Sequence, residues 1–377
     1  MSTRRTVALA LAAALLQPAP GYGWGWHVHS LVNRTAAASL PVEFAAFAQW
    51  TDSLASLASA ADARRCCDDN EAPRHYIDID DYEEFFAGTL PHTYDAMVAR
   101  FGRERVIGNG IVPWAIETAL AQLTEHLRSR DWPRAVAVAA DIGHYVADSH
   151  QPLHLTTNYD GQETGQRGIH SRYESTLTEI YYSSLVPVPG SVSAYARPLD
   201  AVFAWIERVY AGVDQVLYAD RRATNAAGGQ TSGPVYYEVL WRDTGDLTRA
   251  CIRDAALATA ALWYTAWLDA GAPVLPGQGS SPPPPLTLRL LPNAPNPFQD
   301  RTTLRFELPG TGRATLRVLD VRGRLVRTLL DEDPGRGQRS LEWDGRDTEG
   351  RRAPSGTYRL RLEQSGKATE RRAVRVR

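Results

Sequence analysis

The stretch from Asp141 to Glu174, DIGHYVADSHQPLHLTTNYDGQETGQRGIHSRYE, constrains this chain more than any other part of its sequence. Its first half has the apolar period of a helix, and His144 and Asp148 would leave one face of that helix a single turn apart. Pro152 predicts the end of the helix, so that His154 follows just beyond it.

His170 and Glu174 repeat the one-turn spacing on the next expected helix. Imidazoles and carboxylates in such pairs suit borderline divalent metals, zinc above all. The alternative is a pair of helices with exposed polar residues, and for one pair we would favour it. Because two pairs and His154 occur in a short span, the stretch predicts a metal site. Asp141, one turn before His144, is a candidate for orienting that ring through its other nitrogen.

The length of 377 residues favours two domains, and the net charge of −2 gives no global attraction to nucleic acid or to an anionic membrane. Residues 1–23 combine two arginines, an apolar run and small residues, which indicates a signal peptide with Trp24 as the first mature residue. No other stretch is apolar enough to span a bilayer. We therefore expect an exported protein, secreted or at the cell surface, without a transmembrane anchor.

The chain has three cysteines, Cys66, Cys67 and Cys251. In an exported protein, one of the adjacent pair can bridge to Cys251, which leaves an odd thiol. Metal ligation by Cys66 and Cys67 is the less favoured alternative, because adjacent side chains diverge.

The pattern from Trp24 to about Pro273 is helical, with one helix expected from Ala201 to Leu217. The proline-rich run GQGSSPPPP then indicates an extended linker, and about seven short alternating strands follow it. The expected fold class is therefore multi-domain: an all-α domain (residues 24–274), a linker (275–285) and a small all-β immunoglobulin-like sandwich (286–377). All nine histidines precede the linker, so the chemistry belongs to the helical part.

Three further stretches offer ligands to the same site. WGWHVH carries His29 and, after cleavage, a free amino group on Trp24. LASAADARR carries Asp62 near a helix end, and EAPRHYIDIDDY carries His75 followed by three aspartates.

With these motifs, the helical part resembles the superfamily of zinc-dependent phospholipases C and single-strand-specific nucleases, all-helical enzymes with three zincs. The similarity runs from Trp24 to about residue 270, and HYVADSHQPLH matches the H-x-x-x-D-x-H-x-P-L-H signature almost letter for letter. The resemblance implies the following metal ligands: Trp24, His29, Asp62, His75, His144, Asp148, His154, His170 and Glu174.

The resemblance also implies how the ligands divide among three Zn²⁺ ions. Asp62, His75, His144 and Asp148 would hold one ion. Trp24, His29 and the shared Asp148 would hold a second close by, and His154, His170 and Glu174 would hold the third. The nuclease branch carries aspartate at the last position and the phospholipase branch carries glutamate, so Glu174 favours the phospholipase side.

These observations predict a zinc-dependent phosphodiester hydrolase, phospholipase C-like, in which water attacks the substrate and Asp62 is the candidate general base. A single-strand-specific endonuclease or 3′-nucleotidase of the same superfamily is the alternative. An alternative from another class is a non-catalytic zinc-binding surface or adhesive protein. The expected partner is a phospholipid head group or a single-stranded nucleic acid, and the expected state is a monomer.

The C-terminal part resembles the immunoglobulin-like modules of flagellar hook-capping proteins and type IX secretion substrates, through PNAPNPFQDRTTLRFELP and WDGRDTEGRRAPSGTYRLRL. That resemblance implies contact with export machinery or with the cell surface. An inert stabilising module is the alternative.

Overall fold

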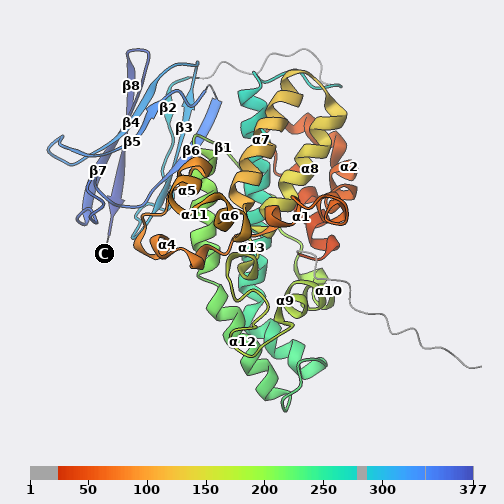
Figure 1. The fold of residues 1–377 in the computed structure, drawn as a ribbon. Coiled ribbons are helices and arrows are strands. Elements are labelled where there is room, and N and C mark those ends of the chain that lie inside the picture. The colour runs from red at the N-terminus through yellow and green to blue at the C-terminus, as the bar shows by residue number, and fades with distance from the viewer. Residues whose placement is uncertain (1–23, 278–286, 336, 377) are drawn as a thin grey trace, which may run out of the picture.

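The computed structural model describes residues 24–277, 287–335 and 337–376, so the expected signal peptide and most of the expected linker lie outside the described residues. As Figure 1 shows, the helices form one body and the strands form a sandwich beside it. The expected fold class, an all-α domain followed by a small all-β module, is confirmed.

Helices account for nearly all regular structure before residue 270. The α-helices are α1 (Trp26–Ala38), α2 (Thr51–Ser56), α3 (Ala60–Arg64), α4 (Glu83–Ala87), α5 (Tyr94–Phe101), α6 (Arg103–Gly108), α7 (Val112–Arg128), α8 (Trp132–Asp148), α9 (Ile169–Ser171), α10 (Thr178–Ile180), α11 (Pro198–Tyr210), α12 (Val213–Ala226) and α13 (Pro234–Asp269). The 3-10 helices are η1 (Ala45–Trp50), η2 (Ala72–His75), η3 (Ile79–Asp81), η4 (Pro152–Leu155) and η6 (Tyr182–Ser184), and η5 (Arg172–Leu177) is a π-helix.

Helix α8 forms the centre of the helical domain. Its first turn begins at Trp132–Pro133, and the Asp131 side chain accepts a hydrogen bond from the Arg134 amide, as expected for an N-cap. Buried alanines on α8, such as Ala139 and Ala140, let its neighbours α1, α7 and α13 approach closely. This packing buries the carboxyl end of α8, where the predicted ligands lie.

The helix expected from Ala201 to Leu217 is instead two helices, α11 and α12, that meet at Gly212. A Cβ atom added at Gly212 would lie 3.0 Å from the Leu247 side chain of α13. The break between α11 and α12 therefore lies where α13 approaches closely, although the apolar period of the sequence alone predicts one continuous helix.

The strands form two four-stranded sheets that enclose a separate apolar core. They are β1 (Ala194–Tyr195), β2 (Arg289–Leu290), β3 (Thr302–Leu308), β4 (Ala314–Leu319), β5 (Leu325–Glu332), β6 (Gly337–Trp343), β7 (Gly356–Gln364) and β8 (Lys367–Arg375). Their orders are β1-β6-β3-β2 and β5-β4-β7-β8, and buried and exposed residues alternate along β4 and β7.

Strand β1 belongs in sequence to the helical domain but completes a sheet of the sandwich. It pairs in parallel with β6, with Ala194 opposite Arg339 and Tyr195 opposite Ser340. The buried Arg339 guanidinium pairs with Asp269 at 2.7 Å and donates to the Tyr195 carbonyl at 3.3 Å. The two parts are therefore joined by backbone pairing and by the ion pair of a buried arginine as well as by the linker. We keep the boundaries at residues 274 and 286 as a proposal.

The expected bridge to Cys251 is not formed. Cys66 and Cys67 are bonded to each other in an exposed turn after α3, whereas Cys251 is a free thiol buried on α13. The two sites lie in different parts of the fold, one at the surface and one in the core. Within the described ranges, no helix has both the length and the apolarity to cross a bilayer.

Candidate metal centre

Helix α8 places the first two predicted ligands. His144 and Asp148 leave the same face of its last turns, and neither has exposed side-chain surface. The Nε2 atom of His144 lies 3.2 Å from Oδ2 of Asp148. The one-turn spacing in the sequence thus becomes a contact between two potential ligand atoms.

Two short elements bring two more donors to this pair. Asp62 comes from α3 and His75 from the end of η2. The Nδ1 atom of His75 is 2.9 Å from Asp148 Oδ2 and 3.0 Å from His144 Nε2, while Asp62 Oδ1 is 3.7 Å from each ring nitrogen. Ligands of a tetrahedral zinc with bonds of about 2.0–2.2 Å lie about 3.3–3.5 Å apart. The observed separations, 2.9–3.7 Å, lie on both sides of that value.

His29, on α1, lies on the other side of Asp148. Its Nε2 atom is 3.6 Å from Asp148 Oδ1, and its ring stacks on that of His144 with the centroids 3.9 Å apart. Asp148 thus presents one oxygen to His75 and His144 and the other to His29. This is the geometry of a carboxylate shared between two neighbouring donor sets.

Trp24 directly precedes α1 and is buried, with its ring 5.7 Å from that of Tyr173. The next amide, Gly25 N–H, donates to the Glu174 carbonyl at 3.5 Å. The start of the described chain therefore lies beside the segment that carries Glu174.

The three remaining predicted ligands form a second compact group. His154 comes from η4, His170 from α9 and Glu174 from η5. The two Nε2 atoms are 3.2 Å apart, and Glu174 Oε2 is 3.2 Å from that of His154 and 2.9 Å from that of His170. Gln151 donates to the same carboxylate oxygen at 3.2 Å, which fixes its orientation.

Backbone carbonyls set which nitrogen of each ring is available. The Nδ1 atoms of His144, His154 and His170 lie 2.8, 2.8 and 3.2 Å from the carbonyl oxygens of Ala58, His75 and Tyr159. Each Nδ1 donates to its carbonyl, so each Nε2 lone pair faces the cluster, as in many metal sites. Asp141 does not orient His144, contrary to the prediction, because the Ala58 carbonyl occupies that position and Asp141 pairs with Arg64 at 3.0 Å.

The ring of His75 is turned the other way, toward a residue that the sequence analysis missed. Its Nε2 atom faces Glu71 Oε1 at 3.5 Å, which leaves Nδ1 toward the cluster. Glu71 has no exposed surface and is held by Tyr145, by Arg64 at 3.1 Å and by Arg74 at 3.1 Å. A signal for it existed, since Glu71 and His75 have the same i, i+4 spacing as the other pairs.

Buried polar atoms without partners test whether these residues fit a metal. Among the described residues, both ring nitrogens of His29 and one carboxylate oxygen each of Asp62, Asp148 and Glu174 are buried and lack a hydrogen bond. Leaving such atoms unpaired costs about 1–3 kcal/mol each. Nitrogen and oxygen donors without cysteine suit borderline or harder cations, so the donor set fits metal ions.

The electrostatics point the same way. Burial alone would lower the pKa of His144, but the carboxylates of Asp148 and Asp62 outweigh it and raise this pKa to about 9. Burial opposes ionisation of Asp148, yet His144 and His154 hold the pKa of its carboxyl well below the usual range. The carboxylates thus stabilise positive charge at this place, and a metal cation would compete with a proton for it.

An acidic loop lies next to this centre. Asp80 accepts hydrogen bonds from the Thr156 hydroxyl at 2.5 Å and the Thr157 amide at 2.9 Å, which anchors the chain just after His154. Burial and the carboxylates of Asp80, Asp81 and Glu163 raise the pKa of Asp78 to about 7. The rim beside His154 is therefore rich in negative charge.

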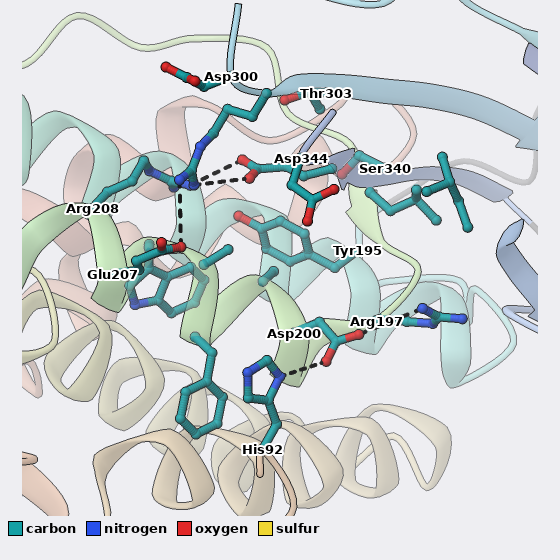
Figure 2. Close-up of a pocket in the computed structure, with 18 of the residues that line it drawn as sticks. His92, Tyr195, Arg197, Asp200, Glu207, Arg208, Asp300, Thr303, Ser340 and Asp344 are labelled. Atoms are coloured by element: carbon teal, nitrogen blue, oxygen red, sulfur yellow. Dashed lines mark hydrogen bonds and ion pairs between the residues drawn. The ribbon is translucent and has the colours of Figure 1, made fainter. Parts of the chain in front are cut away.

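A cavity of about 1340 Å³ lies elsewhere, between α11 and the sandwich, and none of the nine predicted ligands lines it. Figure 2 shows part of its lining, in which His92 faces Asp200 at 3.0 Å. Arg301, another lining residue, pairs with Glu207 at 3.5 Å. The metal-ligand geometry described above is confined to the helical domain.

Comparison with known proteins agrees with both resemblances drawn from the sequence. Residues 24–182 match the family model described as S1/P1 Nuclease, and residues 296–367 match the one described as FlgD Ig-like domain. A probable serine protease from Bradyrhizobium tropiciagri is 23% identical over an alignment of 273 positions, and this alignment covers 57% of this chain and 33% of that relative. The chain thus spans about a third of that relative's length.

Two solved structures align with most of the chain at low identity. Alpha Toxin from Clostridium absonum has a TM-score of 0.42 and 10% identity, over 95% of each chain. The alpha-toxin of Clostridium perfringens avian strain SWCP has a TM-score of 0.42 and 11% identity, over 92% of this chain and 88% of the toxin.

Proposed function

We propose that the helical part of this chain, which matches the S1/P1 nuclease model over residues 24–182, belongs to that family and its superfamily. From that premise, we propose that the protein is an exported, zinc-dependent phosphodiester hydrolase of phospholipase C type. One observation carries the proposal: donors from seven separate elements converge at metal-ligand spacing. A fold without a metal would gain nothing from gathering these imidazoles and carboxylates in its interior.

The nine predicted ligands would hold three ions. Asp62, His75, His144 and Asp148 would surround one, and His154, His170 and Glu174 would surround another. His29, Asp148 and the α-amino group of a mature Trp24 would take the remaining one. The chemistry that bound zinc supplies is Lewis acidity, toward a phosphoryl oxygen and toward water.

The side chains of the protein would orient the donor groups and accept a proton. Asp148 would contact two donor sets at once, because one of its oxygens faces His75 and the other faces His29. Asp62 lies at the edge of the first group and retains a little exposure, 7%, so its carboxylate can accept a proton from an incoming water. Bound cations would also explain how an acidic rim can accept an anionic phosphate.

Two features favour a phospholipid head group as the substrate. Glu174 stands at the position where the resemblance separates the phospholipase branch from the nuclease branch. The acidic loop around Asp78 would repel a long polyanion but would tolerate a head group that carries its own cation.

A single-strand-specific nuclease is the second candidate, because the matching family model is that of S1/P1 nucleases. An exposed aromatic ring lies beside the second donor group: Tyr159 is 51% exposed, with its ring centroid 5.9 Å from that of His170. Such a ring can stack on a base as well as it can contact a head group.

The test is hydrolysis by purified protein that begins at Trp24, with its metal content measured. We expect release of diacylglycerol from phosphatidylcholine, abolished by chelator and restored by zinc, with His154→Ala inactive and His92→Ala active. Digestion of single-stranded DNA alone would select the second candidate. Zinc binding without hydrolysis of either substrate would favour the non-catalytic alternative.

A further inference from the structure

The two parts of the molecule carry opposite charge. Residues 286–377 hold 20 of the 41 Lys and Arg but only 12 of the 43 Asp and Glu, a net of about +8, which leaves about −10 on the rest of the chain. The net charge of −2 is therefore the sum of a basic sandwich and an acidic helical domain. Such asymmetry favours an anionic partner for the sandwich.

Part of this positive charge lies on the outer face of the sheet β5-β4-β7-β8, which is the sheet that β1 does not join (Figure 1). The β7 residues Arg359, Arg361 and Glu363 alternate with the buried Leu360 and Leu362, so they point outward. The strand register places Arg317 opposite Arg361 on one side and Arg372 opposite Arg359 on the other.

The two arginine pairs differ in how they are neutralised. Arg361 contacts Glu363 at 2.7 Å and Glu370 at 3.2 Å, and Arg317 contacts Glu363 at 3.3 Å. The nearest carboxylate to Arg359 is that of Glu370, at 3.8 Å. Within the parts of the chain that the structure describes, no carboxylate forms an ion pair with Arg372.

Like charges directly opposite each other in a sheet are unfavourable, by roughly 0.2–1 kcal/mol. Arg359 and Arg372 are in that relationship, and among the described residues the 3.8 Å contact of Arg359 with Glu370 is the one ion pair that offsets it. A bound anion would relieve the repulsion, and the planar guanidinium fork suits bidentate contact with carboxylate, sulfate or phosphate oxygens.

The same arginines border a hollow of about 410 Å³, lined by Val321, Thr357, Arg359, Glu370, Arg371 and Arg372. The hollow is shallow and open, so a charged group can contact the arginines there without being enclosed. Val321 is the only large apolar side chain in its lining, so the hollow offers little to insert into a membrane.

The strands of this sheet also carry no exposed aromatic side chain on which a nucleic acid base could stack. Tyr358 is the only aromatic residue on β4, β5, β7 and β8, and it is buried in the core with 5% of its surface exposed. Proteins that hold single strands without reading sequence combine positive charge with exposed aromatic platforms. Charge without stacking favours a polymer that is anionic but has no bases.

We propose that this basic face of the sandwich is a binding site for an anionic polysaccharide, in which Arg359 and Arg372 contact a carboxylate or sulfate group of the polymer. The site is independent of the metal centre and places the hydrolase on a surface that carries such a polymer. The acidic helical domain is repelled by the same surface, which orients the molecule with the sandwich toward it.

The experiment uses the full mature chain and measures binding to immobilised heparin and polygalacturonate as a function of salt. The variant is Arg359→Gln with Arg372→Gln. Its matched control is Arg313→Gln with Arg351→Gln, which removes the same charge from exposed arginines that already pair with Asp331 and Asp347. Thermal unfolding and hydrolytic activity should be the same in both variants.

We expect the wild type and the control to bind both polysaccharides, and the Arg359 and Arg372 variant to bind at least about tenfold more weakly. The slope of the logarithm of its binding constant against the logarithm of salt concentration should fall in magnitude by about 2, because two ionic contacts are lost. Equal binding by the two variants, or no binding by the wild type, overturns the proposal. Tighter binding of single-stranded DNA or phosphatidylglycerol vesicles through the same two arginines also overturns it, because the ligand is then of another class.

Discussion

His75 and Asp148, which are 73 residues apart in the sequence, bring Nδ1 and Oδ2 to within 2.9 Å in the interior of the helical domain. The contact joins η2 to the carboxyl end of α8 and places two further donors, His144 and Asp62, around the same point. A metal ion bound there would connect segments that the chain itself separates.

Asp148→Asn should affect two ions at once, because each oxygen of the carboxylate faces a different donor set. We expect the zinc content to fall by more than one ion per chain and hydrolysis to fall on the order of a thousandfold, ~4 kcal/mol of transition-state stabilisation. Metal analysis and initial rates check this. Asp246→Asn, at an exposed site on α13, is the control and should change neither.

Glu71→Gln should weaken zinc binding by about 10–100-fold, because the carboxylate behind His75 fixes its ring and raises its basicity. Zinc affinity is measured by competition with a chromogenic chelator. Excess zinc should restore most of the activity, which a merely misfolded variant would not show. Glu84→Gln removes an exposed carboxylate that pairs with Arg100 and should leave the affinity unchanged.

Trp24 tests the proposed role of the mature N-terminus. Protein that begins at Trp24 should bind one more zinc than protein that retains Gly23, since an amide nitrogen is not a donor to zinc at neutral pH. Activity should fall with the lost ion. If the extended protein keeps full zinc content and activity, the assignment of Trp24 as a ligand is wrong.

Asp78→Asn should stabilise the metal-free protein at high pH. The pKa of this carboxyl rises from 3.8 to about 7 on folding, through burial first and then through Asp80 and Asp81. The folded state therefore binds the proton more tightly, and stability is lost as pH rises through this interval. We expect a gain of about 1 kcal/mol at pH 8 after allowance for solvent screening, and less at pH 4.5.

Urea unfolding in chelator at the two pH values measures this difference. Asp246→Asn is the control, because this exposed carboxylate on α13 pairs with Arg249 at 2.5 Å and is not one of the carboxylates that raise the pKa of Asp78. A gain for Asp78→Asn that is the same at both pH values would contradict the explanation.

Arg339→Met should loosen the seam between the helical domain and the sandwich. It removes the hydrogen bonds of a buried guanidinium to Asp269 and to the Tyr195 carbonyl. Because the Asp269 side chain is 40% exposed and stays solvated, we expect a cost of about 1.5–3 kcal/mol. Calorimetry should then show two unfolding transitions where the wild type shows one. Arg324→Met, at an exposed arginine that pairs with Asp320, should keep a single transition.

The sequence by itself determined the features that depend on neighbouring residues. The i, i+4 spacing of His144 with Asp148 and of His170 with Glu174 follows from helical geometry, and the structure brings each pair into contact. The change from helical to alternating period likewise predicted the fold class. These features need no knowledge of how distant segments pack.

Only the tertiary structure decided which distant groups meet. It placed Glu71 behind His75, gave the orienting position on His144 to the Ala58 carbonyl instead of Asp141, and left Cys251 buried far from Cys66 and Cys67. It also added β1 to a sheet whose other strands lie more than ninety residues later. The physical reason is that such contacts are set by burial and close packing between segments, and no local spacing in the sequence encodes them.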